Sequence, residues 1–109
     1  KFGKQLDGIE VVNATPTLKD ENLRASLINK TILLKAEIGS SDAHIPEAIG
    51  RAYTVFKGKN SQDLRKAITL CQTQAIYSGW NIITLVKYFF FFLPEGLRIA
   101  AYNLTHLFK

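Results

Sequence analysis

An aspartate and a histidine, Asp42 and His44, lie one residue apart in the run GSSDAH at residues 39–44. The run follows an apolar stretch at 31–38, where a buried strand would end in a loop. Side chains alternate along a strand, so both groups would lie on one side and reach one metal ion or two close ions. A carboxylate and a neutral imidazole suit zinc, manganese or iron. The alternative is an ordinary turn, in which Asp42 caps the next helix and His44 is merely exposed.

The segments around this pair form a recognisable order along the chain. DGIEVVN at 7–13 precedes a helical stretch, and the strand that ends in GSSDAH precedes IPE at 45–47 and GRAYT at 50–54. This order resembles the C-terminal third of the PHP (polymerase and histidinol phosphatase) family of metal-dependent phosphoesterases. The resemblance covers about residues 7–72 and is specific, because several separate pieces occur in the right order.

The resemblance implies an α/β fold. The chain would be the C-terminal portion of a distorted (β/α)7 barrel, with parallel strands and crossover helices and the metal ligands at the carboxyl ends of the strands. It makes Asp42 and His44 metal ligands and catalytic residues, in a complete site that holds two or three divalent ions (Mn, Zn or Fe). Asn13, at the exit of its strand, could line the pocket; ending the strand and starting a turn is an equally good role for it.

One charged residue near the motif is a candidate substrate contact. Arg51 has a guanidinium that matches phosphate oxygens in bidentate fashion. The alternative is an ordinary surface arginine. Asn13 and Arg51 are therefore the candidate substrate-binding residues, beside Asp42 and His44.

The chain departs from the family pattern in its histidines. It contains only His44 and His106, whereas the family has an H-x-H pair near its N-terminus and further ligands in mid-chain. We therefore expect the site to be completed by a missing N-terminal barrel portion or by a partner chain, and the 109 residues alone to be inactive. The absence of any methionine favours the first explanation.

Composition limits the classes of function. With 47% hydrophobic residues the chain is not disordered, and its net charge of +5 favours phosphate-bearing ligands without indicating nucleic acid. The single cysteine, Cys71, excludes an intrachain disulfide and agrees with a cytoplasmic location. We expect Cys71 to be a small core residue in a helix.

The pattern of apolar residues predicts two parts. In residues 1–74, the barrel part, it predicts a strand at 9–12, a helix at 20–29 with Leu23 and Leu27 on one face, and a strand through 32–34 and 38. A helical turn at 45–47, a strand at 53–56 and a helix at 61–72 capped by Ser61 follow.

Residues 75–109 form an apolar tail. The run 80–93 contains four consecutive phenylalanines, Pro94 interrupts it, and a second helix is predicted from Glu95. We expect a helical hairpin that packs on the barrel or on a partner. The run is shorter than the roughly 20 residues needed to span a bilayer, although contact with a membrane surface is an alternative.

These observations together predict the C-terminal segment of a metal-dependent phosphoesterase, a hydrolase that attacks phosphate esters with metal-activated water. Substrates of this class include phosphorylated small molecules, nucleotides and nucleic-acid ends. Two alternatives remain: a non-catalytic interaction subunit, and a membrane-peripheral protein that docks through the Phe-rich helix. A second copy of the chain is a further candidate partner.

Overall fold

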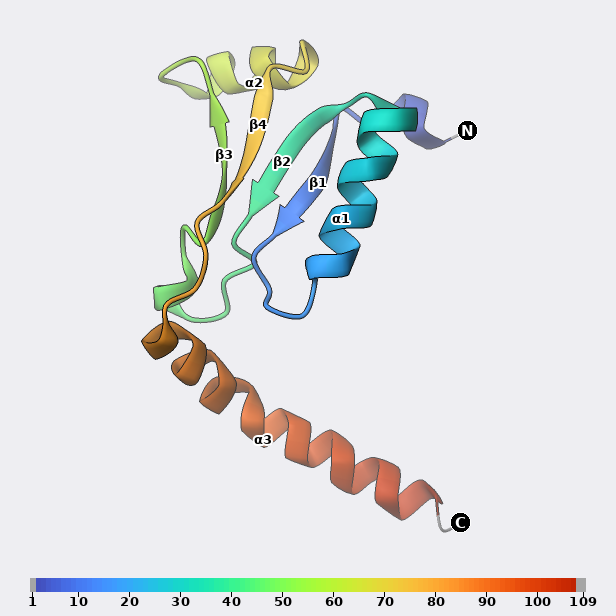
Figure 1. The fold of residues 1–109 in the computed structure, drawn as a ribbon, viewed down its shortest axis with the longest axis vertical. Coiled ribbons are helices and arrows are strands. Elements are labelled where there is room, and N and C mark those ends of the chain that lie inside the picture. The colour runs from blue at the N-terminus through green and yellow to red at the C-terminus, as the bar shows by residue number, and fades with distance from the viewer. Residues whose placement is uncertain (1, 108–109) are drawn as a thin grey trace.

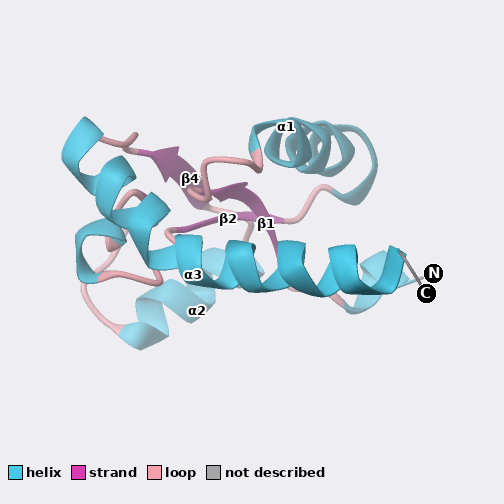
Figure 2. Cartoon of the chain, turned by 90° about the horizontal axis from the view of Figure 1, so that it is seen from below, coloured by secondary structure: helices cyan, strands magenta, loops and turns pink. Residues whose placement is uncertain are grey.

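The part of the chain that precedes residue 82, called the body below, consists of two small sheets with a helix on either side. The structure is a computed structural model that describes residues 2–107 (Figure 1). The first sheet pairs β1 (Gly8–Asn13) with β2 (Ala36–Ser40) in parallel, and the second pairs β3 (Ala52–Phe56) with β4 (Thr73–Tyr77) in antiparallel fashion. Seen from below, α1 (Lys19–Ile28) and α2 (Ser61–Thr69) lie on opposite sides of the strands (Figure 2). The predicted α/β class is confirmed, whereas residues 2–107 do not form a barrel.

The parallel pair is a crossover unit, as the sequence predicted. β1 carries the apolar residues Val11 and Val12, and α1 returns the chain to the start of β2. The prediction of a strand through residues 32–34 is wrong. Asn29–Leu33 forms a π-helical turn, and β2 begins only at Ala36. The side chain of Asn29 holds the chain in this turn: its Oδ1 accepts from the Lys35 amide and its Nδ2 donates to the Lys35 carbonyl.

The second half of the body differs from the prediction around α2. Asn60, rather than Ser61, is the N-cap, since its Oδ1 accepts from the Asp63 amide. The helix ends at Thr69, so Cys71 lies beyond it, exposed and with a φ of 53°, and is not a core residue. The chain then forms β4, which the sequence analysis did not predict.

The two sheets meet at Gly39. Its amide donates to Thr54 Oγ1, and the same hydroxyl donates to the Gly39 carbonyl. A Cβ atom at Gly39 would lie 2.4 Å from the carbonyl oxygen of Tyr53, so no larger residue fits without moving backbone. Glycine is required here for close approach between strands.

The C-terminal tail is one helix, α3 (Ile82–Leu107), and not the predicted hairpin. Pro94 lies within it, so the proline interrupts the hydrogen bonding of the helix without ending it. Figure 1 shows α3 running away from the body beyond its first turns. The boundary expected between residues 74 and 75 falls inside β4. Within residues 2–107, no helix combines the length and apolar character needed to cross a membrane.

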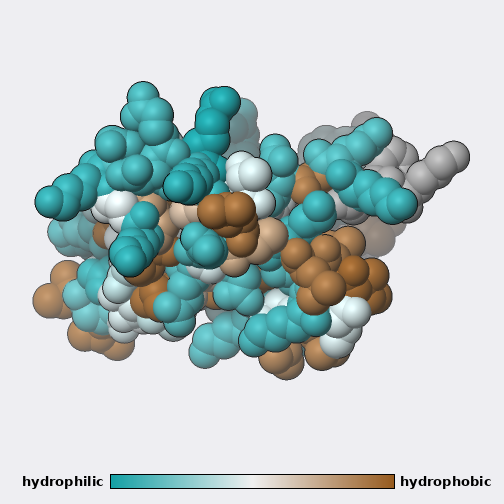
Figure 3. Space-filling model, turned by 90° about the horizontal axis from the view of Figure 1, so that it is seen from above, coloured by the Kyte–Doolittle hydropathy of each residue, from teal (hydrophilic) through white to brown (hydrophobic). Residues whose placement is uncertain are grey.

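The buried core is made mostly of small residues. Among the described residues, the buried apolar positions are one valine and five alanines: Val11, Ala14, Ala36, Ala48, Ala52 and Ala67. Large apolar side chains remain exposed, including Leu23 and Leu27, which were expected to form the inner face of α1. Figure 3 shows apolar patches between the hydrophilic side chains on the upper face. Much apolar surface therefore stays uncovered by the residues that the structure describes.

Candidate functional site

Asp42 and His44 lie just beyond the carboxyl ends of the parallel strands. Asn13, the last residue of β1, is in register with Ser40, the last residue of β2, and the Ala14 amide donates to the Ser40 carbonyl. This contact brings the loops after the two strands together. The carboxyl edge of a parallel sheet is the usual position of a site in α/β folds.

Asp42 is held by two neighbours from the β1 side. Its Oδ2 accepts hydrogen bonds from Asn13 Nδ2 and from Thr15 Oγ1, each at 3.2 Å. Its backbone is left-handed, with a φ of 46°, a conformation that aspartate and asparagine tolerate better than most residues. The carboxylate is therefore oriented through one oxygen, and the other oxygen is left to face His44.

His44 approaches that second oxygen. Its Nε2 lies 3.6 Å from Asp42 Oδ1, with the His44 and Asp42 side chains 48% and 46% exposed. The ring of Phe92, from α3, packs edge-on against the imidazole at a centroid distance of 5.1 Å. The structure thus brings the two predicted ligands together, at a place that solvent and a further group can reach.

The side chain of Asn13 makes hydrogen bonds to several residues of the site besides Asp42. Its Nδ2 also donates to Glu10 Oε1, and its Oδ1 accepts from the Thr15 amide. Asn22 on α1 fixes the backbone of Asn13 by accepting from its amide and donating to its carbonyl. Asn13 therefore ties β1, α1 and the Asp42 loop together: it ends the strand and starts the following turn, and it also contacts Asp42.

Arg51 donates hydrogen bonds within the chain, and its contact with phosphate stays a prediction. Its guanidinium donates to three acceptors: the Glu47 carbonyl, the Gly79 carbonyl and Thr84 Oγ1. These bonds join the turn η3 (Pro46–Ala48), the loop after β4 and the first turn of α3. With these donors engaged inside the protein, the geometry favours a structural role for Arg51.

A row of aromatic rings links the start of α3 to the site. Trp80 packs edge-on against Tyr88, Tyr88 contacts Phe92, and Phe92 contacts His44. The indole of Trp80 donates to the Ala14 carbonyl, next to Asn13. Sequence reasoning missed Thr15 and Phe92 as site neighbours. Four adjacent phenylalanines carry no signal that singles out one of them, and Thr15 required the fold of the loop after β1.

Glu47 on η3 forms an ion pair with Lys87 on α3. The hydrogen bond from Lys87, helped by a backbone hydrogen bond to the same carboxylate, lowers the pKa of Glu47 from its ordinary value. This pair, with Arg51, attaches the first turns of α3 to the body.

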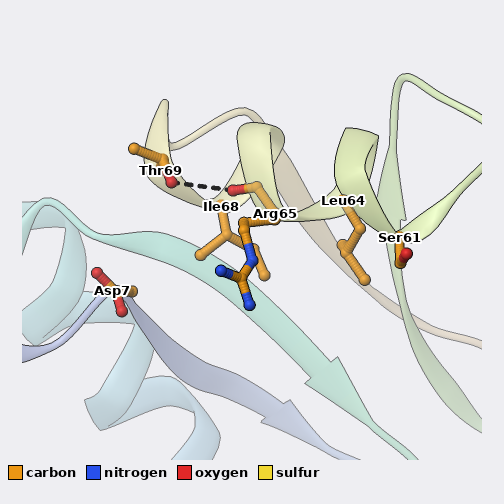
Figure 4. A pocket seen from close by; sticks show the side chains of 6 residues that line it. All are labelled: Asp7, Ser61, Leu64, Arg65, Ile68 and Thr69. Carbon is orange, nitrogen blue, oxygen red and sulfur yellow. Dashed lines mark hydrogen bonds between the residues drawn. The ribbon is translucent and has the colours of Figure 1, made fainter.

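One cavity of the body lies away from Asp42 and His44. It has a volume of about 530 Å³ and is lined by Asp7, which precedes β1, and by residues of α2 (Figure 4). Arg65 reaches from α2 toward Asp7 across it. Asp7 is at the amino end of β1, whereas Asn13 is at its carboxyl end, so this cavity is separate from the Asp42 and His44 site.

The donor set suits part of a metal centre. One carboxylate oxygen and one imidazole nitrogen face each other, and these are ligands that Zn, Mn and Fe accept. No group of three or more His, Cys, Asp or Glu side chains that could hold a metal occurs within residues 2–107. Asp42 and His44 are thus two donors that could take part in a metal site, and no third such side chain stands with them in the described part of the chain.

Comparison with known protein families gives a match to part of the chain. Residues 21–73, just under half of the chain, match a family described as PHP-associated. No curated protein and no solved structure gives a significant match. The matched region includes β2, the Asp42 and His44 loop, β3 and α2. Residues 21–73 are therefore similar to the PHP-associated family, which confirms the resemblance to the C-terminal part of the PHP family.

Proposed function

We propose that this chain is the C-terminal segment of a PHP-type metal-dependent phosphoesterase and that Asp42 and His44 supply two ligands of its metal centre. The observation that carries the proposal is the pairing of Asp42 Oδ1 with His44 Nε2 at 3.6 Å, beyond the carboxyl ends of β1 and β2. The PHP-associated match supports it, since it covers the same loop.

The residues of this chain would orient the ligands. Asn13 and Thr15 hold one oxygen of Asp42, and Phe92 packs on the ring of His44, so both donors are fixed before a metal arrives. Such outer contacts commonly decide how well a ligand binds. Divalent ions (Mn, Zn or Fe, two or three in the complete site) supply a water of lowered pKa and positive charge for the phosphate oxygens.

The substrate class follows from that chemistry and not from a shaped pocket. A phosphorylated small molecule, a nucleotide or a nucleic-acid end would each present a phosphate ester to such a centre. The net charge of +5 favours all of these. The remaining ligands would come from an N-terminal barrel portion or from a partner chain, in a cytoplasmic enzyme.

The proposal is tested with the 109-residue chain itself. Binding of Mn²⁺, followed by electron paramagnetic resonance, should be weak and should be lost in Asp42→Asn. The matched control is Asp20→Asn, which neutralises an exposed aspartate in the first turn of α1. Equal loss in both variants, or no binding at all, would contradict a ligand role for Asp42.

The same chain should hydrolyse a chromogenic phosphate ester no faster than buffer that contains Mn²⁺, because two ligands do not make a complete site. Turnover that survives purification and disappears in Asp42→Asn would show that the chain builds its own active site. The fragment part of the proposal would then be wrong.

A second candidate function is a non-catalytic interaction subunit. The observation that favours it is α3, whose large apolar side chains are mostly exposed. In that case the chain would dock through α3, and Mn²⁺ binding would be absent. A third candidate, attachment to a membrane surface through the Phe-rich helix, is tested by sedimentation with liposomes.

A further inference from the structure

The side of α3 that faces the body is defined by a few residues. Thr84 is buried, and Tyr88 and Phe92 are half-buried, and each contacts the body through Arg51, Trp80 or His44. These residues are spaced by four along the helix, so they form one stripe. Beyond Leu93, every described residue of α3 is exposed.

The opposite side of α3 carries an unbroken apolar seam. Its residues alternate in spacing between three and four, from the first turn of the helix to its last: Ile83, Val86, Phe90, Leu93, Leu97, Ala100, Leu104 and Leu107. This is the a/d pattern of a heptad repeat over eight consecutive positions, and it is typical of a helix that pairs with another helix. In the same heptad, Thr84, Tyr88 and Phe92 occupy outward b, f and c positions.

The seam is open to solvent. Its large residues other than Leu93 are 47–78% exposed, and Leu93 is half-buried. Pro94 lies at the e position beside the seam, so it does not interrupt the eight residues. A lipid surface does not select a period of 3.5 residues, whereas a second helix does.

The seam is complementary to itself in the antiparallel direction. When two copies of α3 run in opposite directions, each a position faces a d position of the other copy. With the two-fold axis at Glu95, Ile83 faces Leu107, Val86 faces Leu104, Phe90 faces Ala100, and Leu93 faces Leu97. The largest seam residue, Phe90, then meets the smallest, Ala100, in two layers related by the two-fold axis. Large residues facing small ones allow the two helices to interdigitate. Parallel pairing would instead stack Phe90 on Phe90 and Ala100 on Ala100.

We propose that α3 is the interface of an antiparallel two-fold dimer of this chain, formed through the seam from Ile83 to Leu107. The body lies against the opposite side of α3. The helix of the partner copy can therefore cover the seam without displacing the body. Burial of an apolar side chain removes on the order of 60–120 Å² from water. Six large seam residues, with smaller areas from Leu93 and Ala100, therefore approach the roughly 800 Å² per partner of a stable interface. The inference is independent of the proposed phosphoesterase function.

The first test is the mass of the full chain in solution, measured by sedimentation equilibrium over a range of concentrations. We expect a monomer–dimer equilibrium. Leu97→Lys places a charge in the seam and should raise the dimer Kd by roughly tenfold or more. Ile99→Lys is the matched control, because Ile99 is 55% exposed and Leu97 62% exposed, but Ile99 lies outside the seam. Neither residue contacts the body, so circular dichroism should show both variants folded.

The second test addresses direction. Phe90→Lys and Ala100→Glu should each weaken the dimer, since each leaves a charge in an apolar layer. The double variant should dimerise better than either single variant, because antiparallel pairing sets every lysine against a glutamate. Parallel pairing would set like charges together. A double variant no better than the singles would overturn the antiparallel register.

Two further outcomes would overturn the dimer itself. One is a wild-type chain that stays monomeric at every concentration; sedimentation of that monomer with phosphatidylcholine vesicles would assign the seam to lipid instead. The other is an equal loss of dimer in Leu97→Lys and Ile99→Lys, which would show nonspecific association of an apolar helix.

Discussion

Asn13 Nδ2 donates to Asp42 Oδ2 across 3.2 Å, and these two residues are 29 positions apart in the sequence. The bond spans the two loops that leave the carboxyl ends of β1 and β2. It fixes the orientation of the candidate metal-binding carboxylate from the neighbouring strand. Asn13 is thus a positioning residue for Asp42, which is a narrower role than the pocket lining that the sequence suggested.

Asn13→Ala should weaken metal binding more than it weakens the fold. Removing an outer partner of a ligand commonly costs about 10–100-fold in metal affinity. The lost hydrogen bonds should lower the free energy of unfolding by about 1 kcal/mol each. Mn²⁺ titration and thermal melting measure the two effects. Glu10→Gln is the control, since a glutamine can still accept the hydrogen bond from Asn13; an equal loss of affinity there would argue against this role.

In the assembled enzyme, Asp42→Asn should abolish activity and leave the fold nearly intact. Asparagine tolerates the left-handed backbone of Asp42 at least as well as aspartate does, so the change removes charge without strain. His44→Ala should act on the same cluster, and the double variant should be little worse than either single. The rates at which the complete enzyme and its three variants hydrolyse a phosphate ester measure these effects. Independent, multiplicative losses would mean that the two residues do not share a site.

The sequence predicted the parallel unit and the meeting of Asp42 with His44, because both depend on local signals. The apolar run of β1, the crossover helix and the close spacing of the two ligands required no long-range information. The start of β2 was misplaced because the Asn29 side chain, six residues away, determines the conformation of Lys35. These two hydrogen bonds leave no periodic pattern of apolar residues in the sequence.

The tail and Arg51 could not be predicted for a different reason. The sequence marked Pro94 as a break, but a proline inside a helix can kink it without ending it, and α3 continues through Pro94. Arg51 is engaged by acceptors on Gly79 and Thr84, about thirty residues later. Their position depends on β4, whose pairing with β3 was not foreseen.

Arg51→Lys should lower the melting temperature of the chain. A lysine has one nitrogen and cannot reach the three acceptors that the guanidinium spans, so at least two hydrogen bonds of about 0.5–1.5 kcal/mol each should be lost. Arg24→Lys, on the exposed side of α1, is the control. If Arg51 instead binds phosphate, its replacement would raise the KM of the complete enzyme while leaving the melting temperature unchanged.

Gly39→Ala should destabilise the junction of the two sheets. The added methyl group would lie 2.4 Å from the Tyr53 carbonyl oxygen, and backbone on both sides must move to accept it. Overpacking of this kind costs about 1–3 kcal/mol. Gly96→Ala, in the open interior of α3, should instead gain about 0.5–1 kcal/mol. Chemical denaturation measures both. A neutral Gly39→Ala would show that the sheets do not meet as closely as described.

The Glu47–Lys87 pair should make the attachment of α3 depend on pH. Because Lys87 lowers the pKa of Glu47 below its ordinary value of 4.5, the folded state binds the proton less readily than the unfolded state does. The stabilisation is fully present above the ordinary value, and it is lost as the pH falls through the lower pKa of the folded state. The melting temperature of Glu47→Gln should therefore lie below that of the wild type near neutral pH and approach it in acid.

Lys87→Met should have the same effect, and the double variant should add little, since either change removes the same pair. High salt should narrow the gap, because the pair is partly exposed. Wild-type and Glu47→Gln melting curves that stay the same distance apart from neutral pH into acid would show that this ion pair does not hold α3 to the body.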